Sequence, residues 1–579
     1  MYKNVWYNKK TSQMHVWCNT HNIYDWVPYV FVGTDKKTKI KTTDGNPVIR
    51  KRFANYGKYK NFQKNNNDIY ENELLPDIQF LAEKYSDVKD DDIVPPTLRI
   101  HALDIECHSD DGSFPKPSEA KWPVTVIGVH DSINECTYLL GTKEYTNTTL
   151  ENKNVKYIKC KNEKALLKSY VLLTHKLKPD IITGWNIIPS YKFNISGFDI
   201  EYIVNRIKNT FTDDPDYWKK MSPLNKGMSY SDNNGNMNVL LPGITLIDYE
   251  AAYKMFSRNN PESYSLDFIS KLELGKGKID TSQYGGLKNL YNDNYNLYCD
   301  YNVIDVKRVV ELEKKLGYIN IIQSLSLISR CPMRHYQAMT TIIEGMFITY
   351  YRRNNICAPY FRGGTQGTFP AGYVKDPQKG LHKWVASIDI VSSYPTAIIS
   401  LNMSNESYVG KVTSFTDNDI IEYTTKRQYP PFDMYNILSD SKSYIDGKRL
   451  VIFNKLLSKG LLCIAPNGVI FRRDIKGILS EVERQMFVKR KEVKGMMKKT
   501  TDKDEKNRMF TYQYSLKVIL NSVFGATAVP YSRYFNLHIA EAIPACGKHT
   551  VRQGEKYINE LLNEPNDVLK GILDEIRNE

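Results

Sequence analysis

The sequence predicts a multidomain α/β protein with a β-rich N-terminal part. Its 579 residues are more than one hydrophobic core holds. Short aromatic strands alternate with basic loops through roughly the first hundred residues, as in HVWC and VPYVFVG. From Leu98 onward strand patterns alternate with helical ones, and two highly charged helical segments flank a polar turn between Gly477 and Gly525. These observations favour several domains of mixed type.

The composition favours a polyanionic partner with bases that can stack. Lysine and arginine total 79 against 65 acids, a net charge of +14, and the chain has 41 tyrosines and 21 phenylalanines. Ribosome-associated and membrane-surface proteins are equally basic, so the charge alone does not decide. The nine cysteines are scattered without a CxxC pair, the start is too polar for a signal peptide, and no apolar stretch reaches about 18 residues. We therefore expect a soluble intracellular protein with no membrane contact.

The central part of the sequence predicts a mixed sheet followed by helices. LRIHALDIEC and VTVIGVHDS predict adjacent strands, and LLKSYVLLTHKL predicts a helix that leads into the strand PDIITGW. A hairpin is expected around Asn234-Gly235, and a long helical stretch over about 300–350. The loop APYFRGGTQGTFPAGYV follows, and then a short apolar run that ends at Asp389.

Four carboxylates in the predicted α/β region are candidate metal ligands. Asp104 and Glu106 are two apart on a strand, so both side chains project from one face. Asp199 follows a turn-rich loop, and Asp305 comes four residues after Tyr301 on a predicted helix, so that these two share a face. Together the four acids would bind two divalent cations for phosphate chemistry. A single acid of this kind is more often a solvated surface residue, so the order and context of the four decide.

The sequence around these acids resembles a known family. LDIECHSDDGSFPKPSEA, GWN with GFDIEYIVNR, and YNVIDV look like the three exonuclease motifs of family B DNA polymerases, in particular those of T-even-type bacteriophages. The resemblance implies a ribonuclease H-like 3′→5′ proofreading exonuclease with two Mg²⁺ ions, for which Mn²⁺ can substitute. It implies that Asp104, Glu106, Asp199 and Asp305 bind the metals and that Tyr301 helps to orient the attacking water.

Two features of this region bear on how DNA would be handled. The link IIPSYKFNIS between Asn186 and Phe198 is longer than is usual in the family, which leaves the local loop geometry open. The hairpin at Asn234-Gly235 resembles the one that helps to part primer from template. An ordinary surface hairpin is the alternative.

DIVSSYPT resembles motif A of the polymerase part of the family. The resemblance implies that Asp389 binds both polymerase metals and that Ser392 and Ser393 present backbone groups to the nucleotide triphosphate. Tyr394 would lie beneath the incoming sugar and exclude a 2′-hydroxyl. The family usually has Leu at the position of Ser393. Without the other motifs, the tripeptide SYP would predict only a β-turn.

The charged helical hairpin resembles the fingers domain and motif B of the family. Arg490 and Lys494 are four apart and share a helix face, and Lys517, Asn521 and Gly525 do the same on the returning helix. Arginine would neutralise the triphosphate through its forked guanidinium group, and lysine through the compact charge of its ammonium group. Gly525 would leave a flat surface for the nascent base pair. Without the family spacing, a charged hairpin predicts a solvated surface.

Two further glycines are expected to touch DNA. Gly363 and Gly364 in FRGGTQGTFPAGYV fit the family's junction between the exonuclease and polymerase modules, where glycines let the backbone approach template phosphates. APNGVIFRRDIKGIL matches the crossing from palm to fingers. Phe524 stands where the family usually has Tyr, which keeps the ring and loses a hydroxyl.

The resemblance implies five regions along the chain. The second polymerase carboxylate of the family lies in motif C, a Tyr-Gly-Asp-Thr-Asp hairpin, and neither motif C nor a thumb follows motif B here. The regions are an N-terminal domain at 1–98 (with about 319–360 packing on it), the exonuclease domain at 99–318, the first part of the palm at 361–476, the fingers at 477–527 and the second part of the palm at 528–579, truncated before motif C.

We therefore expect the large part of a split phage replicative DNA polymerase with a proofreading exonuclease. Its partners would be primer-template and single-stranded DNA, dNTPs, a second polypeptide with motif C and thumb, and a sliding clamp reached through that polypeptide, in the cytoplasm of the infected host cell. The alternatives are a stand-alone or truncated exonuclease and a non-catalytic nucleic-acid-binding relic. An apolar stripe near the C-terminus would either pack on its own palm or dock the missing half; it consists of Val568, Leu569, Ile572, Leu573 and Ile576.

Overall fold

The computed structural model describes the chain except for residues 148–153, 233–234, 258, 286, 362, 366, 370–371, 377–378, 382–388, 564–570, 572–573 and 575–579. The apolar stripe predicted near the C-terminus, the apolar run that precedes Asp389, and Asn234 of the predicted hairpin lie outside the described residues. Within the described part of the chain, no helix combines the length and the apolar character needed to cross a membrane.

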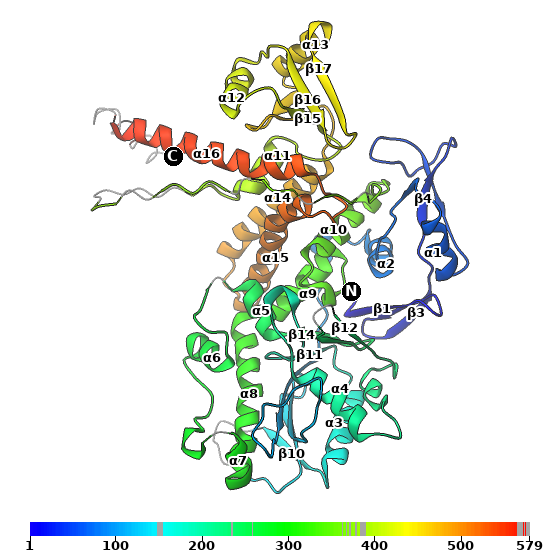
Figure 1. Cartoon of the computed structure of the whole chain (residues 1–579), viewed down its shortest axis with the longest axis vertical. Coiled ribbons are helices and arrows are strands. Elements are labelled where there is room, and N and C mark those ends of the chain that lie inside the picture. Colours follow the sequence, from blue (N-terminus) through cyan, green and yellow to red (C-terminus); the bar gives the residue numbers. More distant parts are fainter. Residues whose placement is uncertain are drawn as a thin grey trace. The chain divides into compact units, whose positions relative to one another are not determined.

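The chain forms two compact units, and each draws on separate stretches of the sequence (Figure 1). The first unit consists of Met1–Pro28, Arg52–Asn61 and Leu75–Ala338, and the second of Tyr29–Lys51, Phe62–Leu74 and Met339–Glu579. The predicted β-rich N-terminal part is confirmed, and its strands are divided between the units. The first unit has β1 (Asn4–Asn8), β2 (Gln13–Trp17) and β3 (His21–Asp25), and the second has β4 (Val30–Gly33), β5 (Val48–Lys51) and β6 (Ile69–Tyr70). The five domain ranges stay predictions.

A six-stranded mixed sheet forms the centre of the first unit, which confirms the predicted α/β character of this region. Its strands lie in the order β10-β9-β8-β7-β11-β14. β7 is antiparallel to β8 and parallel to β11, which in turn is parallel to β14. The strands are β7 (Ile100–Cys107), β8 (Val124–Asp131), β9 (Cys136–Gly141), β10 (Val155–Lys159), β11 (Ile181–Gly184) and β14 (Thr245–Asp248).

The two faces of this sheet bury different helices. On one face, Leu103 and Ile105 of β7 share a core with residues of α3 and α4. On the other face, Val126 of β8 packs with Tyr298 of α8. Because side chains alternate along a strand, the residues of β7 between and beyond Leu103 and Ile105 face α8. The helices of the first unit are α2 (Pro76–Tyr85), α3 (Glu163–Leu177), α4 (Asp199–Thr210), α5 (Tyr249–Phe256), α6 (Leu266–Leu274), α7 (Leu287–Asp293), α8 (Tyr295–Leu316) and α9 (Tyr318–Ser329), while α1 (Tyr56–Lys64) spans a boundary between the units.

The helical stretch predicted over about 300–350 consists of three helices. α8 ends at Leu316, α9 covers Tyr318–Ser329, and α10 covers Met339–Arg353. Gly317 separates the first two because it adopts a positive φ of 65°, which glycine does without steric cost. Arg330, also with a positive φ, ends α9 just before Pro332.

The second unit contains an antiparallel sheet and a helical hairpin. The sheet has the strand order β17-β16-β15-β19-β18. The predicted charged hairpin is confirmed as α14 (Ile478–Lys499) and α15 (Lys503–Ala528), which pack against each other. Asp502 caps α15, because its side chain accepts from the backbone N of Glu505 at 2.7 Å. The other elements are α11 (Ser393–Ser400), β15 (Tyr408–Val412), α12 (Asp417–Lys426), β16 (Phe432–Asn436), β17 (Ser441–Ile445), α13 (Gly447–Ser458), β18 (Leu462–Ile464), β19 (Val469–Arg472) and α16 (Leu537–Asn563).

Segments far apart in the sequence meet around Arg533 in the second unit. The buried guanidinium donates to the carbonyl oxygens of Asn72 at 2.7 Å and Pro359 at 2.8 Å, and to Oε1 of Glu344 at 2.8 Å. Asn72 and Arg533 are 461 positions apart. The second unit is therefore held together by residues from near both ends of the sequence.

Candidate active site

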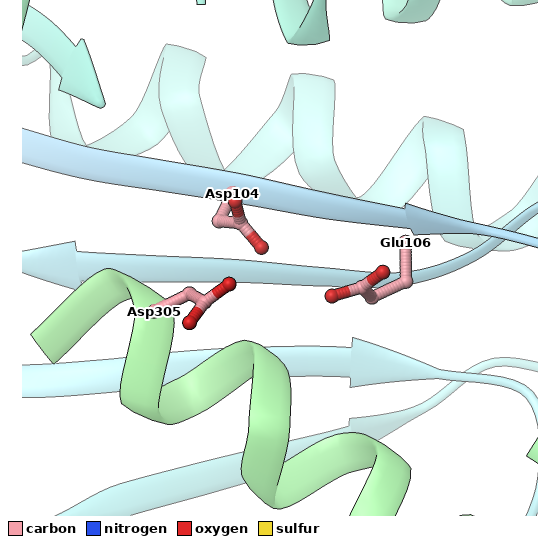
Figure 2. A group of neighbouring side chains, drawn as sticks. All are labelled: Asp104, Glu106 and Asp305. Atoms are coloured by element: carbon pink, nitrogen blue, oxygen red, sulfur yellow. The ribbon is translucent and has the colours of Figure 1, made fainter. Parts of the chain in front are cut away.

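Three carboxylates converge on the side of β7 that faces α8 (Figure 2). One oxygen from each of Asp104, Glu106 and Asp305 lies within 4.8 Å of the others. Figure 2 shows Asp104 and Glu106 on a strand and Asp305 on the helix opposite, with all three turned toward a common space. Glu106 and Asp305 are buried. Among the residues that the structure describes, no other group of three potential metal ligands has this spacing.

Close packing of α8 on the sheet makes this convergence possible. Gly128 of β8 lies opposite Asp104 in the strand register. A Cβ on Gly128 would come within 2.2 Å of Oδ1 of Asn302, so any larger residue there would displace the Asn302 side chain. Nδ2 of Asn302 donates to Oδ2 of Asp104 at 2.7 Å, which orients that carboxylate. The same face of α8 therefore supplies both a carboxylate and a group that positions one.

Asp199 lies beside the three carboxylates without joining their group. It is the first residue of α4 and is buried. Its Oδ1 accepts from the backbone N of Ile105 at 3.0 Å, between Asp104 and Glu106 in the sequence. That Asp199 binds a metal as the fourth acid stays a prediction.

Lys278 is a cation at this site that sequence reasoning missed. Its Nζ donates to Oδ2 of Asp305 at 2.5 Å and to the hydroxyl oxygen of Tyr301 at 3.3 Å. Tyr301 and Asp305 thus lie on one face of α8, with Lys278 against both. The backbone N of Lys278 donates to Oδ1 of Asp267 at 2.7 Å, so α6 holds the loop that carries it. Lys278 is 27 positions from Asp305, and no spacing rule connects them.

Burial and mutual repulsion raise the pKa values of the acids. Burial, and after it the negative charge of Asp305, raises the pKa of Glu106 to about 8. Burial also raises the pKa of Asp199 to about 8. The pKa of Asp104 is raised well above its usual range by burial and then by the neighbouring carboxylates. Burial raises the pKa of Asp305 to about 6, although Lys278 acts in the opposite direction. This set of acids therefore needs more positive charge than Lys278 provides if all are to ionise near neutral pH.

The residues present fit hard divalent cations. Carboxylate oxygens are the ligands that Mg²⁺ prefers. Oδ1 of Asp305 is buried and has no hydrogen-bond partner, so it remains available as a ligand. A divalent cation would also stabilise the ionised acids and lower their raised pKa values. The site is thus suited to metal binding by its donor atoms, its spacing and its electrostatics.

The long link between Asn186 and Phe198 forms a closed loop. Oδ1 of Asn186 accepts from the backbone N of Gly197 at 3.1 Å. Inside the loop, Ser190 and Ile195 exchange two backbone hydrogen bonds of 2.9 and 3.0 Å. The extra residues therefore bulge out between two joined ends, and Asp199 remains at the start of α4.

The predicted hairpin that follows α4 is present in the structure. Met228–Ser231 (β12) pairs antiparallel with Met237–Leu240 (β13). Met228 and Tyr230 are exposed on it. A role of this hairpin in parting primer from template stays a prediction.

Two positions where the chain departs from the family pattern lie in packed contacts of the second unit. The ring of Phe524 on α15 lies 5.0 Å from the ring of Tyr394 on α11 and 6.0 Å from that of Phe369. Ser393 lies against α16, because a Cβ on Gly547 would be 3.3 Å from the Ser393 hydroxyl. A small side chain thus fits at 393, and Phe524 packs directly against the predicted sugar-sensing Tyr394.

The remaining predicted polymerase residues lie on several different elements of the second unit. Asp389 is exposed, and no group of three potential metal ligands among the described residues includes it. Ser392 has a positive φ of 51° at the start of α11. Burial lowers the pKa of Arg490, whose Nε has no hydrogen-bond partner. Arg490 and Lys494 lie on α14, and Lys517, Asn521 and Gly525 on α15.

The three glycines predicted to touch DNA differ in their surroundings. A Cβ on Gly364 would meet the ring of Phe535 at 2.2 Å, so packing alone requires glycine there. Gly363 has a positive φ of 66°, and neither it nor Gly525 has any atom within 4 Å of an added Cβ. The open space at Gly525 is compatible with the predicted flat surface for a base pair.

Comparisons with known proteins agree along both parts of the chain. The model of DNA polymerase family B matches residues 332–575, and the model of the exonuclease domain of that family matches residues 49–269. The DNA-directed DNA polymerase of Escherichia phage RB69 is 28% identical over 595 residues, and that of Enterobacteria phage T4 is 25% identical over 594 residues. Each of these matches covers 93% of this chain but only 64% of the relative.

A more distant relative shows the same pattern. The DNA polymerase catalytic subunit of Alcelaphine herpesvirus 1 is 23% identical, over 83% of this chain and 43% of its own length. The chain thus spans less than two thirds of the length of these curated relatives. With both its exonuclease and its polymerase regions matched, the chain belongs to DNA polymerase family B.

Proposed function

We propose that the first unit removes nucleotides from the 3′ end of DNA by metal-dependent hydrolysis. The convergence of Asp104, Glu106 and Asp305 within 4.8 Å is the observation that carries this proposal. Two Mg²⁺ ions held there, or Mn²⁺ in their place, would activate a water and stabilise the departing 3′ oxygen. Asp199 would act as the fourth acid, since its carboxylate already bonds the backbone N of Ile105 between two of the others.

Tyr301 and Lys278 would position the water and the phosphate. The hydroxyl oxygen of Tyr301 accepts a hydrogen bond from Lys278, which leaves the hydroxyl proton free to be donated to a water or a phosphate oxygen. Lys278 also offsets the negative charge of Asp305. We assign the orientation of the attacking water to Tyr301, and the positioning of Tyr301 and Asp305 to Lys278.

An exposed aromatic side chain supports a single-stranded substrate. The side chain of Phe114 is 78% exposed, and its ring lies 5.8 Å from that of Phe198, the residue before Asp199. Exposed rings beside a polynucleotide site are stacking surfaces for unpaired bases. The net charge of +14 adds a general attraction to phosphates.

Labelled single-stranded DNA tests this function directly. With a 5′ label, the purified chain and Mg²⁺ should produce a ladder that shortens one nucleotide at a time from the 3′ end. A 3′ label should be released at once as a mononucleotide, and a chelator should stop both reactions. A chain that is inert with both Mg²⁺ and Mn²⁺, or that degrades DNA from the 5′ end, would refute the proposal.

We further propose that the second unit takes part in template-directed DNA synthesis. Support comes from the family match over residues 332–575 and from the contact of Tyr394 with Phe524. Asp389 would bind the metals, and Tyr394 would lie beneath the sugar of the incoming dNTP. The other groups proposed to bind the dNTP are Ser392, Ser393, Arg490, Lys494, Lys517 and Asn521, while Gly363, Gly364 and Gly525 would approach the primer-template.

Primer extension tests the polymerase proposal. We propose, as the resemblance to the family implies, that a second polypeptide with motif C and thumb supplies the second carboxylate and that a clamp is reached through it, in the infected host cell. Extension should appear when a polypeptide corresponding to the rest of the relatives is added. It should disappear again with Asp389→Ala in this chain. Extension that survives Asp389→Ala would contradict the role of Asp389.

A further inference from the structure

The closed loop between β11 and α4, residues 187–197, presents an aromatic ring and a cation that the reaction does not use. We propose that this loop is a contact for single-stranded DNA, in which Tyr191 stacks on an unpaired base and Lys192 binds a phosphate. The proposal rests on the proposed function of the first unit, because it concerns the strand whose 3′ end would reach the acids. The loop is the segment whose length departs from the family pattern.

The sheet topology places the root of the loop at the same edge as the acids. β7, β11 and β14 run parallel, so their carboxyl ends lie at one edge of the sheet. Thr183 pairs with Ala102, so that Trp185 is level with Asp104 as the chain leaves β11. Ligands of such sheets bind outside the carboxyl ends of the strands. A single strand of DNA that enters the acid site therefore passes over the loops that follow β11 and β14.

Several hydrogen bonds give the loop a defined shape. Its ends are joined through Asn186 and Gly197, and Ser190 pairs with Ile195 across its middle. The Ser190 hydroxyl donates to Oε1 of Gln337 at 2.6 Å, and the carbonyl oxygen of Phe193 accepts from Nζ of Lys254 at 3.4 Å. Ile187 and Ile195 bury their side chains beneath it. The loop is thus fixed to its surroundings before any partner binds.

The tip of this fixed loop leaves a large ring in water. Tyr191 is 82% exposed. Among the described residues, the next most exposed tyrosine or phenylalanine is Phe114, at 78%. Lys192 beside it is also exposed, and its Nζ donates a long hydrogen bond of 3.5 Å to the carbonyl oxygen of Gln337. The segment IIPSYKFNISG contains no acid that would repel a phosphate. A preformed tyrosine next to a lysine suits a polynucleotide, because every base has a face that stacks and every link carries a charge.

Binding of DNA in the absence of cleavage tests the loop. A single-stranded oligonucleotide with 2-aminopurine at successive positions from its 3′ end is titrated with the full chain in Ca²⁺, a cation chosen to permit binding without hydrolysis. Tyr191→Ala should weaken binding about tenfold, which is about 1.4 kcal/mol. Tyr191→Phe should keep the wild-type affinity, because it keeps the ring. One probe position should lose its quenching in Tyr191→Ala and retain it in Tyr191→Phe.

The lysine is tested through salt dependence. For Lys192→Ala the slope of log affinity against log salt concentration should fall by about 0.7, the value for one phosphate contact on a single strand. Ile133→Ala is the matched control, because Ile133 is an exposed side chain in the turn after β8, at the opposite edge of the sheet. Its affinity and salt slope should equal those of the wild type.

The outcomes separate this proposal from the exonuclease itself. Wild-type affinity in Tyr191→Ala, or an unchanged slope in Lys192→Ala, would overturn the loop proposal even if the chain degrades DNA from the 3′ end. A chain that degrades no DNA would refute the exonuclease, yet a tenfold loss in Tyr191→Ala would still support the loop as a DNA contact. Equal losses in Tyr191→Ala and Tyr191→Phe would show that the ring does not stack, and would also overturn the proposal.

Discussion

The two candidate sites of the chain differ in how completely the protein itself assembles them. In the first unit, buried acids from β7 and α8 meet within 4.8 Å, and Lys278 and Asn302 already hold two of them. In the second unit, Asp389 is exposed and belongs to no such group among the described residues. The proposed exonuclease site is therefore already assembled by the protein, and burying its acids close together raises their pKa values. The exposed Asp389 carries no comparable burial cost, and we expect the dNTP, the metals and DNA to bring the proposed nucleotide-binding residues together.

The largest expected effect is the loss of the proposed exonuclease activity when Asp104, a proposed metal ligand, is replaced. Asp104→Ala should lower the rate of 3′ nucleotide release by about 10³-fold, since metal ligands act through several kcal/mol of transition-state stabilisation. Rates with labelled oligonucleotides measure the effect, and circular dichroism checks the fold. Asp213→Ala, an exposed acid of the same unit that bonds Lys164, is the control and should keep full activity. Equal activity in Asp104→Ala and wild type would contradict the role of Asp104 as a metal ligand, and with it the contrast between the two sites.

The next effect concerns the cation that balances the acids. Lys278→Met should lower the free energy of unfolding in a chelating buffer by about 3 kcal/mol, because it leaves the buried carboxylate of Asp305 without its partner. Added Mg²⁺ should then stabilise the variant more than it stabilises the wild type. Denaturant unfolding with and without Mg²⁺ measures both. In the exposed pair of Lys271 with Asp267, Lys271→Met should change stability by less than about 0.5 kcal/mol.

A third test asks whether burial alone, without clustering, also governs an acid of this unit. Burial raises the pKa of Glu313 on α8 to about 7, although the backbone N of Ile319 and the hydroxyl of Tyr249 donate to it. The folded state thus keeps a proton that the unfolded state loses at lower pH. The stabilisation from this proton is full below about pH 4.5 and is lost as the pH rises to about 7.

Glu313→Gln should remove this pH dependence. Between pH 4.5 and pH 8 the wild type should lose up to about 3 kcal/mol of unfolding free energy relative to the variant. Urea unfolding at several pH values measures the difference. Glu135→Gln, an exposed acid of the same unit, should follow the wild type. A wild type that becomes more stable than Glu313→Gln as the pH rises would show that the hydrogen bonds outweigh burial.

The smallest effect is expected at the second site. Asp389→Ala should change the free energy of unfolding by less than about 0.5 kcal/mol, since an exposed side chain outside any ligand group contributes little to folding. Denaturant unfolding of the variant and the wild type measures it. A loss above about 1 kcal/mol would mean that Asp389 is structurally held, and the contrast between the two sites would disappear.

Patterns confined to one element predicted much of the first site. The two-residue spacing of Asp104 and Glu106 on a strand indicated one shared face, and the four-residue spacing of Tyr301 and Asp305 on a helix did the same. The structure has Asp104 and Glu106 on β7, and on α8 it has Tyr301 and Asp305, both in contact with Lys278. Periodicity within a strand or a helix is set by local backbone geometry, so it can be deduced without knowledge of the fold.

Contacts between elements could not be deduced in this way. Lys278 reaches Asp305 through a loop that is fixed by Asp267, and nothing in the intervening sequence indicates that closure. The length of the link after Asn186 was visible, but its closure onto Gly197 was not. The division of the helical stretch was accessible, because Gly317 and Pro332 are local signals for helix ends. The rest depended on packing between distant segments.

The hydrogen bonds from Arg533 to Asn72 have a consequence for synthesis on the ribosome. At about 5–20 residues per second, roughly 20–90 s separate the emergence of these two residues. The strands of Tyr29–Lys51 and Phe62–Leu74 belong to the unit that is completed last, although they are made among the first. Limited proteolysis of ribosome-bound chains stalled before and after Arg533 would measure when these strands become protected. Until then they are nascent edges without their final neighbours, and slower translation would lengthen the time in which they can pair wrongly.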